Sequence, residues 1–235
     1  MQPEFWLERW QNGQVGFHQA TVHSSLTRYG DVLAPRDALA PRDGLGPRDA
    51  HASRAGRVFV PLCGKSIDML WLRDAGHEVV GVELSAIAAE AFCMENGLPA
   101  RRRILADFDC YEAPGMALLR GDFFSLTRAI LGPVSAVYDR AALVSFAPEL
   151  RASYVAQLAA LVTAGTRVLL VSMEYPMAQI SGPPFSLPRA EVEQLCTRYF
   201  DVQELGREEI LASEPRLRAR GLTRLTEVCY RLTRR

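Results

Sequence analysis

The feature that most constrains this chain is a succession of strand, turn, helix, strand and acid between Arg57 and Glu83. A short apolar run at 57–61 ends in a turn that contains Gly64, and an amphipathic stretch at helical spacing follows. A second apolar run at 78–82 then ends in Glu83. In such a unit the turn presents backbone N–H groups to a ligand, and the acid can accept hydrogen bonds from ribose hydroxyls. The unit therefore predicts a nucleoside-containing cofactor at the carboxyl edge of a parallel sheet.

Three classes of cofactor could use this unit. Gly64-Lys65-Ser66 matches the end of a P-loop, but Phe59 stands where that motif needs its first glycine. A dinucleotide needs the G-x-G-x-x-G pattern, of which only Gly64 is present. A cofactor with a ribose but no phosphate needs fewer glycines, because no pyrophosphate has to approach the backbone. S-adenosylmethionine is the obvious cofactor of this kind, and the other two classes remain as weaker alternatives.

The composition of the chain narrows its partners and location. Its 235 residues suffice for one α/β domain with a sizeable core, and 27 basic residues balance 27 acidic ones. Because no basic stripe is present, we expect no nucleic-acid partner. No apolar run approaches the roughly 18 residues of a membrane span, and no signal-peptide pattern begins the chain. Five scattered cysteines without a C-x-x-C pair predict reduced thiols, a cytoplasmic protein and no metal site.

Apolar patterns predict alternating helices and strands along the rest of the chain. Helices are expected over residues 66–75, 86–96, 148–164 and 188–199. Strands are expected near 57–61, 78–82, 116–120, 134–138, 166–173, 200–206 and 223–232. This interleaving predicts a doubly wound α/β sheet. The last two runs have no helical pattern between them, so we expect them to form an antiparallel hairpin at the edge of the sheet.

One stretch breaks the composition of the chain. Residues 35–49 read PRDALAPRDGLGPRD, with three Pro-Arg-Asp triplets. Each proline disfavours helix at the residue before it, and each Arg-Asp pair is self-neutralising. These properties predict an exposed, flexible insertion rather than a folded repeat. We therefore expect a single domain over 1–235, with an N-terminal segment at 1–33, the insertion at 34–55 and a Rossmann-like core at 56–235.

Six motifs in order give the chain a family resemblance. They are WLERWQNGQVGFHQ at 6–19, VFVPLCGKSIDMLWL at 58–72, GHEVVGVELS at 76–85, GDFF at 121–124, VYDRAALV at 137–144 and SGPPFSLP at 181–188. Together they resemble the thiopurine S-methyltransferase family, particularly its bacterial members, over nearly the whole chain. The family's connection is much shorter than the insertion at 34–55.

The resemblance implies a class I S-adenosylmethionine-dependent methyltransferase fold. This fold has a doubly wound, seven-stranded, mostly parallel sheet with an antiparallel edge strand. The implied activity is methylation of the sulfur of aromatic or heterocyclic thiols such as thiopurines, and some bacterial relatives are linked to selenium or tellurium species. The implied partner is a small-molecule thiol, no metal is needed, and nothing in the chain requires an oligomer, so we expect a monomer.

The resemblance also assigns the residues that hold the cofactor. Glu83 is expected to bind the ribose, and the main chain of Leu62 and Gly64 to contact the methionine part. Cys63 between them is expected to pack rather than to act as a nucleophile.

Further cofactor contacts are expected from two other segments. Asp122 is expected to accept from the adenine amino group and Phe123 to cover the ring, whereas Phe124 is assigned to the core. Trp10 and Phe17 resemble the family's active-site cover, and the alternative is an amphipathic helix that docks by its aromatic face.

The substrate side is expected to be lined by residues from distant parts of the chain. Arg140, after the fourth strand, is expected to lie between cofactor and substrate and to carry the catalytic role, with a salt bridge to Asp139 or another nearby acid as the alternative. His18 is expected to line the site, either as a base or as a structural hydrogen-bond partner. Phe185 is expected to form an aromatic wall, and Arg216 matches a second substrate-side arginine.

The expected reaction is one in-line displacement by a thiolate. Alignment of two bound reactants supplies effective molarities of roughly 10⁵–10⁸ M, which outweighs the ~10²–10⁴-fold typical of one general base. Catalysis is therefore assigned mainly to positioning, with Arg140 favouring an anionic substrate. Two other functions remain open at this point: a silent protein that senses S-adenosylmethionine, and a nucleotide hydrolase.

Overall fold

The computed structural model describes residues 3–15, 18–34 and 56–235. Phe17 lies outside these residues, as does the expected insertion except for Ala34, which is buried. The chain divides into one compact unit that ends at Tyr138 and a second that runs from Asp139 to Arg235. The expected single domain stays a prediction.

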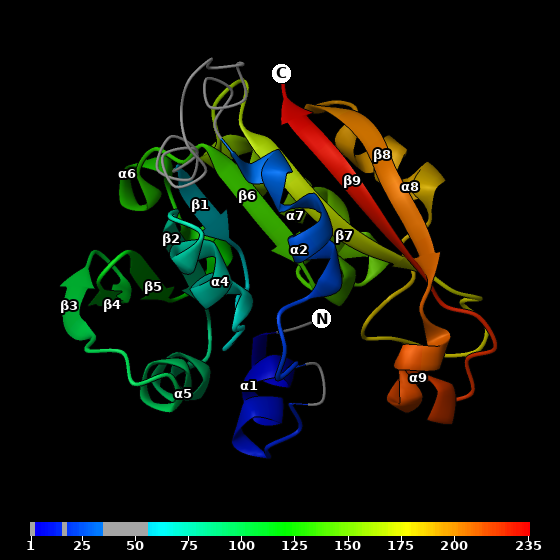
Figure 1. Cartoon of the computed structure of the whole chain (residues 1–235), viewed down its shortest axis with the longest axis horizontal. Helices are drawn as coiled ribbons and strands as arrows, with labels where there is room; N and C mark the ends of the chain where they lie inside the picture. Colours follow the sequence, from blue (N-terminus) through cyan, green and yellow to red (C-terminus); the bar gives the residue numbers. More distant parts are fainter. Residues whose placement is uncertain (1–2, 16–17, 35–55) are drawn as a thin grey trace, which may run out of the picture. The chain divides into compact units, whose positions relative to one another are not determined.

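The first unit is built on a central parallel sheet (Figure 1). Its strands follow the order β3-β4-β5-β2-β1-β6. The parallel strands are β1 (Arg57–Val60), β2 (Glu78–Glu83), β5 (Met116–Arg120) and β6 (Ala136–Arg140), the last of which continues into the second unit. All four were expected from the sequence. Parallel pairing brings the carboxyl ends of β5, β2 and β1 to the same edge of the sheet.

Two strands of the first unit were missed by the sequence analysis. β3 (Arg101–Leu105) and β4 (Phe108–Ala113) pair antiparallel with each other, and β4 pairs antiparallel with β5. β3 is last in the strand order and exposes four of its five residues. Such a strand has no apolar face to bury, so it carries no alternating pattern that sequence analysis could detect.

Short helices complete the first unit. They are α1 (Pro3–Gln11), α2 (Ser24–Tyr29), α4 (Asp68–Asp74), α5 (Ala86–Glu95) and α6 (Arg128–Leu131), with 3₁₀ turns η1 (Gly30–Leu33) and η3 (Phe123–Ser125). α4 and α5 both contact β2. α5 begins directly after Ser85, whose hydroxyl accepts from the N–H of Ala88 at 3.2 Å and satisfies a free donor of the first turn.

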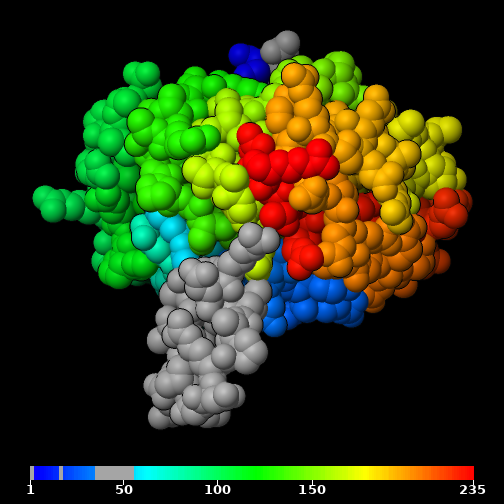
Figure 2. Space-filling view, turned by 90° about the horizontal axis from the view of Figure 1, so that it is seen from above, coloured from blue at the N-terminus to red at the C-terminus, as the bar shows by residue number. Residues whose placement is uncertain are grey.

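The second unit has its own antiparallel strands. β9 (Thr226–Arg234) lies between β7 (Arg167–Glu174) and β8 (Phe200–Glu209) and pairs antiparallel with both. Figure 2 shows the C-terminal residues in red between yellow-green and orange segments of the same unit. The expected antiparallel pair is confirmed, although the strand at the end of this order is β8 rather than β9.

The helices of the second unit are α7 (Pro148–Leu161), α8 (Arg189–Cys196) and α9 (Pro215–Ala219), with 3₁₀ turns η4 (Leu143–Ser145) and η5 (Leu211–Ser213). The expectation that no helix separates the last two strands is wrong, because η5 and α9 lie there. α9 has only five residues, too few for a periodic signal. Among the described residues no helix is both long and apolar enough to cross a membrane.

Candidate functional site

The carboxylate of Glu83 joins the turn after β1 to the start of α5. Its Oε2 accepts from the N–H of Gly64 at 2.8 Å, and its Oε1 accepts from the N–H of Ser85 at 2.7 Å. Glu83 is only 7% exposed. Burial raises the pKa of its carboxyl, and the N–H groups of Ser85, Gly64 and Leu84 oppose that rise. Since a carboxylate has about four acceptor positions, it can still accept from a ligand hydroxyl.

The turn between β1 and α4 holds two residues in the left-handed backbone region. These are Leu62 at φ 47° and Gly64 at φ 54°. A left-handed leucine is uncommon, and backbone strain of this kind clusters at ligand sites. The N–H of Cys63 donates to the carbonyl of Val82 at 3.0 Å, which ties the turn to the end of β2. The turn is therefore fixed against the strand that carries Glu83.

Cys63 is a packing residue in this turn. A Cβ atom at Gly81 would lie 2.6 Å from the Cys63 sulfur, so the glycine makes room for the thiol. Burial, with the nearby charge of Glu83 as the second cause, raises the pKa of the Cys63 thiol well above its usual range. A buried neutral thiol is a poor nucleophile. The structure therefore supports the expectation that Cys63 packs.

Trp10 covers the same turn from the N-terminal segment. It is 7% exposed, and a Cβ atom at Gly64 would lie 3.3 Å from its indole ring. Any side chain at position 64 would press on the indole. α1 therefore docks by its aromatic residue directly on the turn, as both the cover interpretation and its alternative require.

A buried aspartate anchors the next part of the N-terminal segment. Asp68 is fully buried, and its carboxylate accepts from the N–H of His23 at 2.9 Å and from the hydroxyl of Tyr138 at 3.1 Å. Since His23 caps α2, this network ties that helix to α4 and β6. His18 lies in the same segment and is partly exposed, and its N–H donates to the carbonyl of Val15 at 2.8 Å. The sequence analysis missed Asp68.

Lys65 does not act as a P-loop lysine in this structure. Its Nζ donates to both carboxylate oxygens of Glu95 on α5, at 2.8 and 2.9 Å. The lysine therefore forms an ion pair within the first unit. This pairing weakens the P-loop interpretation, because that motif needs its lysine for the phosphates of a nucleotide.

The two phenylalanines after β5 differ in burial. Phe123 is 5% exposed and stacks on Phe59 with ring centroids 6.5 Å apart, whereas Phe124 is 44% exposed. The assignment of Phe124 to the core is wrong. The exposed carboxylate of Asp122 accepts from the N–H of Phe124 at 3.0 Å. A contact of Asp122 or Phe123 with adenine stays a prediction.

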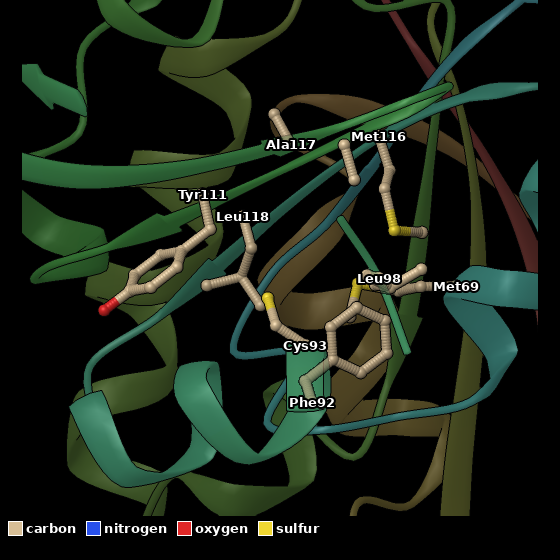
Figure 3. Close-up of a pocket in the computed structure, with 9 residues that line it drawn as sticks. Met69, Phe92, Cys93, Leu98, Tyr111, Met116, Ala117 and Leu118 are labelled. Carbon is tan, nitrogen blue, oxygen red and sulfur yellow. The ribbon is translucent and has the colours of Figure 1, made fainter. Parts of the chain in front are cut away.

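A small apolar cavity lies elsewhere in the first unit. Figure 3 shows its walls, in which Phe92 and Cys93 from α5 face Met116 and Leu118 from β5. None of the described site residues predicted from the sequence lines it. The cavity is small and mostly apolar, so we assign it to packing around α5.

In the second unit, the residues after β6 form a braced turn. Arg140 ends β6 and is partly exposed, and Ala141 follows with φ 64°. The carboxylate of Asp139 accepts from the N–H of Leu143 at 3.1 Å and from the hydroxyl of Tyr154 at 2.7 Å. These bonds tie Asp139 to the start of η4 and to α7, and the salt bridge of Arg140 with Asp139 or another nearby acid stays a prediction.

The loop that carries Phe185 is held from several sides within the second unit. The N–H of Phe185 donates to the carbonyl of Val144 at 2.8 Å, which connects the loop to the turn after Arg140. The hydroxyl of Tyr175 donates to Pro184 O at 2.6 Å. Arg151, fully buried, donates to the carbonyl of Ser186 at 3.0 Å. The loop is therefore an ordered wall.

α9 is attached to the same loop. Arg220, just after α9, donates to the carbonyl of Pro183 at 3.1 Å. Leu217 of α9 joins Tyr175 in one buried cluster, and Arg216 is exposed beside it in the sequence. The second unit thus connects the segments that carry Arg140, Phe185 and Arg216, three of the four expected substrate-side residues, although these segments lie far apart in the chain.

Comparison with known proteins identifies the family. A sequence model of the thiopurine S-methyltransferase family matches residues 47–235. A thiopurine S-methyltransferase of Nitrosospira multiformis is 43% identical over 235 residues, which cover 100% of this chain and 99% of that one. The chain belongs to the thiopurine S-methyltransferase family. A second member of the family, from Xanthomonas campestris pv. campestris, is also 43% identical, with 100% of both chains covered.

The fold agrees with membership of the thiopurine S-methyltransferase family. The 1,6-didemethyltoxoflavin-N1-methyltransferase of Burkholderia thailandensis, solved with S-adenosylhomocysteine, aligns with a TM-score of 0.54 at 16% identity. The alignment covers 98% of this chain and 87% of that one. The fold is the class I S-adenosylmethionine-dependent methyltransferase fold, and this family member is a methyltransferase whose cofactor is S-adenosylmethionine. The buried Glu83, the single glycine turn and the ion-paired Lys65 fit a cofactor that has a ribose but no phosphate.

Proposed function

We propose that this enzyme methylates the sulfur of an aromatic or heterocyclic thiol, such as a thiopurine. The observation that carries the proposal is the 43% identity to thiopurine S-methyltransferases over the whole chain. The braced segments that hold Arg140, Phe185 and Arg216 add support, because a positioned cation and an aromatic wall suit a flat anionic substrate.

The first unit is proposed to hold the cofactor. Glu83 would accept from the ribose hydroxyls, the main chain of Leu62 and Gly64 would contact the methionine part, and Trp10 would close over the turn. Asp122 and Phe123 are proposed to contact the adenine, and Phe17 is proposed to belong with Trp10 to the active-site cover. The burial of Glu83 and the seating of Trp10 on Gly64 support these roles.

The second unit is proposed to orient the substrate. S-adenosylmethionine supplies a methyl group that its sulfonium has already activated for a thiolate. Arg140 would favour the anionic form of the thiol, because its guanidinium stays charged at any working pH. Phe185 would provide a wall, and Arg216 and His18 would line the substrate side. Positioning would then carry most of the rate enhancement.

A turnover assay tests this function. The purified chain is incubated with methyl-labelled S-adenosylmethionine and, separately, with 6-mercaptopurine, thiophenol, thiosalicylate, selenite and tellurite. We expect S-methylated product from the aromatic and heterocyclic thiols, and the last two arms extend the test to selenium and tellurium species. Cofactor binding without methylation of any thiol would contradict the proposal and favour a sensor. Light scattering on the same sample tests the proposed monomer, and cell fractionation tests the proposed cytoplasmic location.

A further inference from the structure

Asp139 is the most deeply buried acid next to a proposed substrate residue. It is 1% exposed, and it directly precedes Arg140 as the penultimate residue of β6. Burying a carboxylate is costly unless donors surround it. The buried carboxylate of Asp139 therefore requires an explanation, since an apolar residue at this position would carry no desolvation cost.

The donors around Asp139 all act on the segment that follows Arg140. The carboxylate accepts from the N–H of Leu143 at 3.1 Å, and the N–H of Ala142 contributes as well. Ala142 is the N-cap of η4 and Leu143 its first residue, and N–H groups at the start of a helix have no partner within the helix. Between them and Arg140 lies only Ala141, whose φ of 64° the chain adopts at a cost. The carboxylate therefore sets the backbone direction immediately after Arg140.

Tyr154 holds the other side of the carboxylate. Its hydroxyl donates to Asp139 Oδ2 at 2.7 Å, and Tyr154 is fully buried in the middle of α7. Its ring also packs against Phe146, with centroids 5.0 Å apart, at the far end of the same turn. Tyr154 thus fixes both the carboxylate and the segment that the carboxylate organises.

We propose that Asp139, held by Tyr154, is a positioning residue that fixes the backbone of Arg140 for substrate binding. The inference rests on the proposed function, because it requires Arg140 to contact the substrate. It adds that the turn is one element with the Phe185 loop, since the N–H of Phe185 donates to Val144 in this turn. Movement of this turn would therefore displace the guanidinium of Arg140 and the ring of Phe185 together.

The test is a double-mutant cycle on the full-length enzyme. Asp139→Asn and Tyr154→Phe are each made alone and together with Arg140→Ala. Tyr230→Phe is the control, because Tyr230 is buried in the same unit and its hydroxyl has no hydrogen-bond partner within the described part of the chain. The readouts are kcat/KM for thiosalicylate and thiophenol, calorimetric affinity for S-adenosylmethionine, and the melting temperature.

We expect Asp139→Asn to lower kcat/KM for thiosalicylate by roughly 10- to 100-fold, as a misplaced catalytic group does. Tyr154→Phe should lower it by about 3- to 10-fold, and Tyr230→Phe by less than about 2-fold, since it removes no described bond. Affinity for S-adenosylmethionine should stay within about 2-fold of wild type in every single variant. In the Arg140→Ala background the two changes should have almost no further effect, because residues that act through one group are not additive.

Three results would overturn the inference. If Asp139→Asn costs as much in the Arg140→Ala background, Asp139 has a general structural role. If Arg140→Ala lowers the rate but folded Asp139→Asn and Tyr154→Phe do not, only the role of Asp139 fails. If Arg140→Ala has the wild-type rate, the proposed role of Arg140 fails, and this inference fails with it. If Asp139→Asn does not fold, the test uses the cycle of Tyr154→Phe with Arg140→Ala. Equal losses from Tyr154→Phe with and without Arg140 would then overturn the inference.

Discussion

Glu83 in the first unit and Asp139 in the second are buried carboxylates near the carboxyl ends of parallel strands, and each organises a turn. Glu83 is 7% exposed and accepts from Gly64 and Ser85, which are backbone donors close to it in the β1–α5 region. Asp139 is 1% exposed and accepts its shortest bond from a side chain on α7. A buried carboxylate thus organises a turn that is proposed to bind the cofactor in one unit and forms an internal brace in the other, and the neighbouring donors differ accordingly.

The largest expected effect concerns the ligand role of Glu83. Glu83→Gln should weaken S-adenosylmethionine binding by roughly 10- to 100-fold, because hydrogen bonds to a charged acceptor contribute about 1.5–3 kcal/mol each. Isothermal titration calorimetry on the folded variant measures this. Glu95→Gln is the matched control, since Glu95 is a carboxylate of the same unit that pairs with Lys65 at the surface. Equal affinities for all three proteins would remove Glu83 from the cofactor site.

The next effect concerns the group that Asp139 braces. Arg140→Ala should lower kcat/KM for thiosalicylate by about 10- to 100-fold and for neutral thiophenol by much less, because only the anionic substrate can pair with a guanidinium. Arg140→Lys should restore part of the loss, since lysine keeps the charge but not the planar fork. Steady-state kinetics with both thiols measures the difference. Equal losses for both, together with weaker cofactor binding, would make Arg140 a cofactor or structural residue.

The brace role of Asp139 also predicts a pH dependence of stability. Burial raises the pKa of Asp139 to about 6, against the effect of the Tyr154 hydroxyl and the backbone donors. Because the protonated form is favoured in the folded state, this group's contribution to stability is full below about pH 4 and is lost as the pH rises to about 6. The loss is on the order of 1–3 kcal/mol. Tyr154 and Cys196 face this carboxyl, and the pKa values of both are raised, so neither titrates in this range.

Urea unfolding of wild type and Asp139→Asn between pH 4.5 and 7 checks this prediction. The wild type should lose free energy of unfolding relative to the variant as the pH rises, since the variant cannot ionise at this position. Taking the difference between the two proteins removes the contribution of Glu83, whose carboxyl pKa is also raised. Parallel curves for the two proteins would mean that Asp139 titrates as an ordinary carboxyl.

The smallest effect is expected for Lys65, which lies next to the Glu83 turn but points to α5. Lys65→Ala should change affinity for S-adenosylmethionine by less than about 3-fold and stability by less than about 1 kcal/mol, because partly exposed ion pairs contribute little. Calorimetry and thermal unfolding measure the two quantities. A large fall in affinity would mean that the cofactor site reaches this lysine, and would weaken the contrast between a phosphate-free site and a P-loop.

By itself, the sequence determined the strand–turn–helix–strand unit from β1 to β2 and the acid at its end. Those features depend on short-range periodicity and on a turn whose donors lie near Glu83, so a single stretch of chain carries the information. The tertiary structure decided that Phe123 is buried and Phe124 exposed, since both phenylalanines follow the same strand and only packing against Phe59 separates them. It also decided that Asp139 pairs with Tyr154, a partner brought to it by the folding of α7. Contacts of this kind form between elements that are separate in the sequence, so a local pattern of residues cannot predict them.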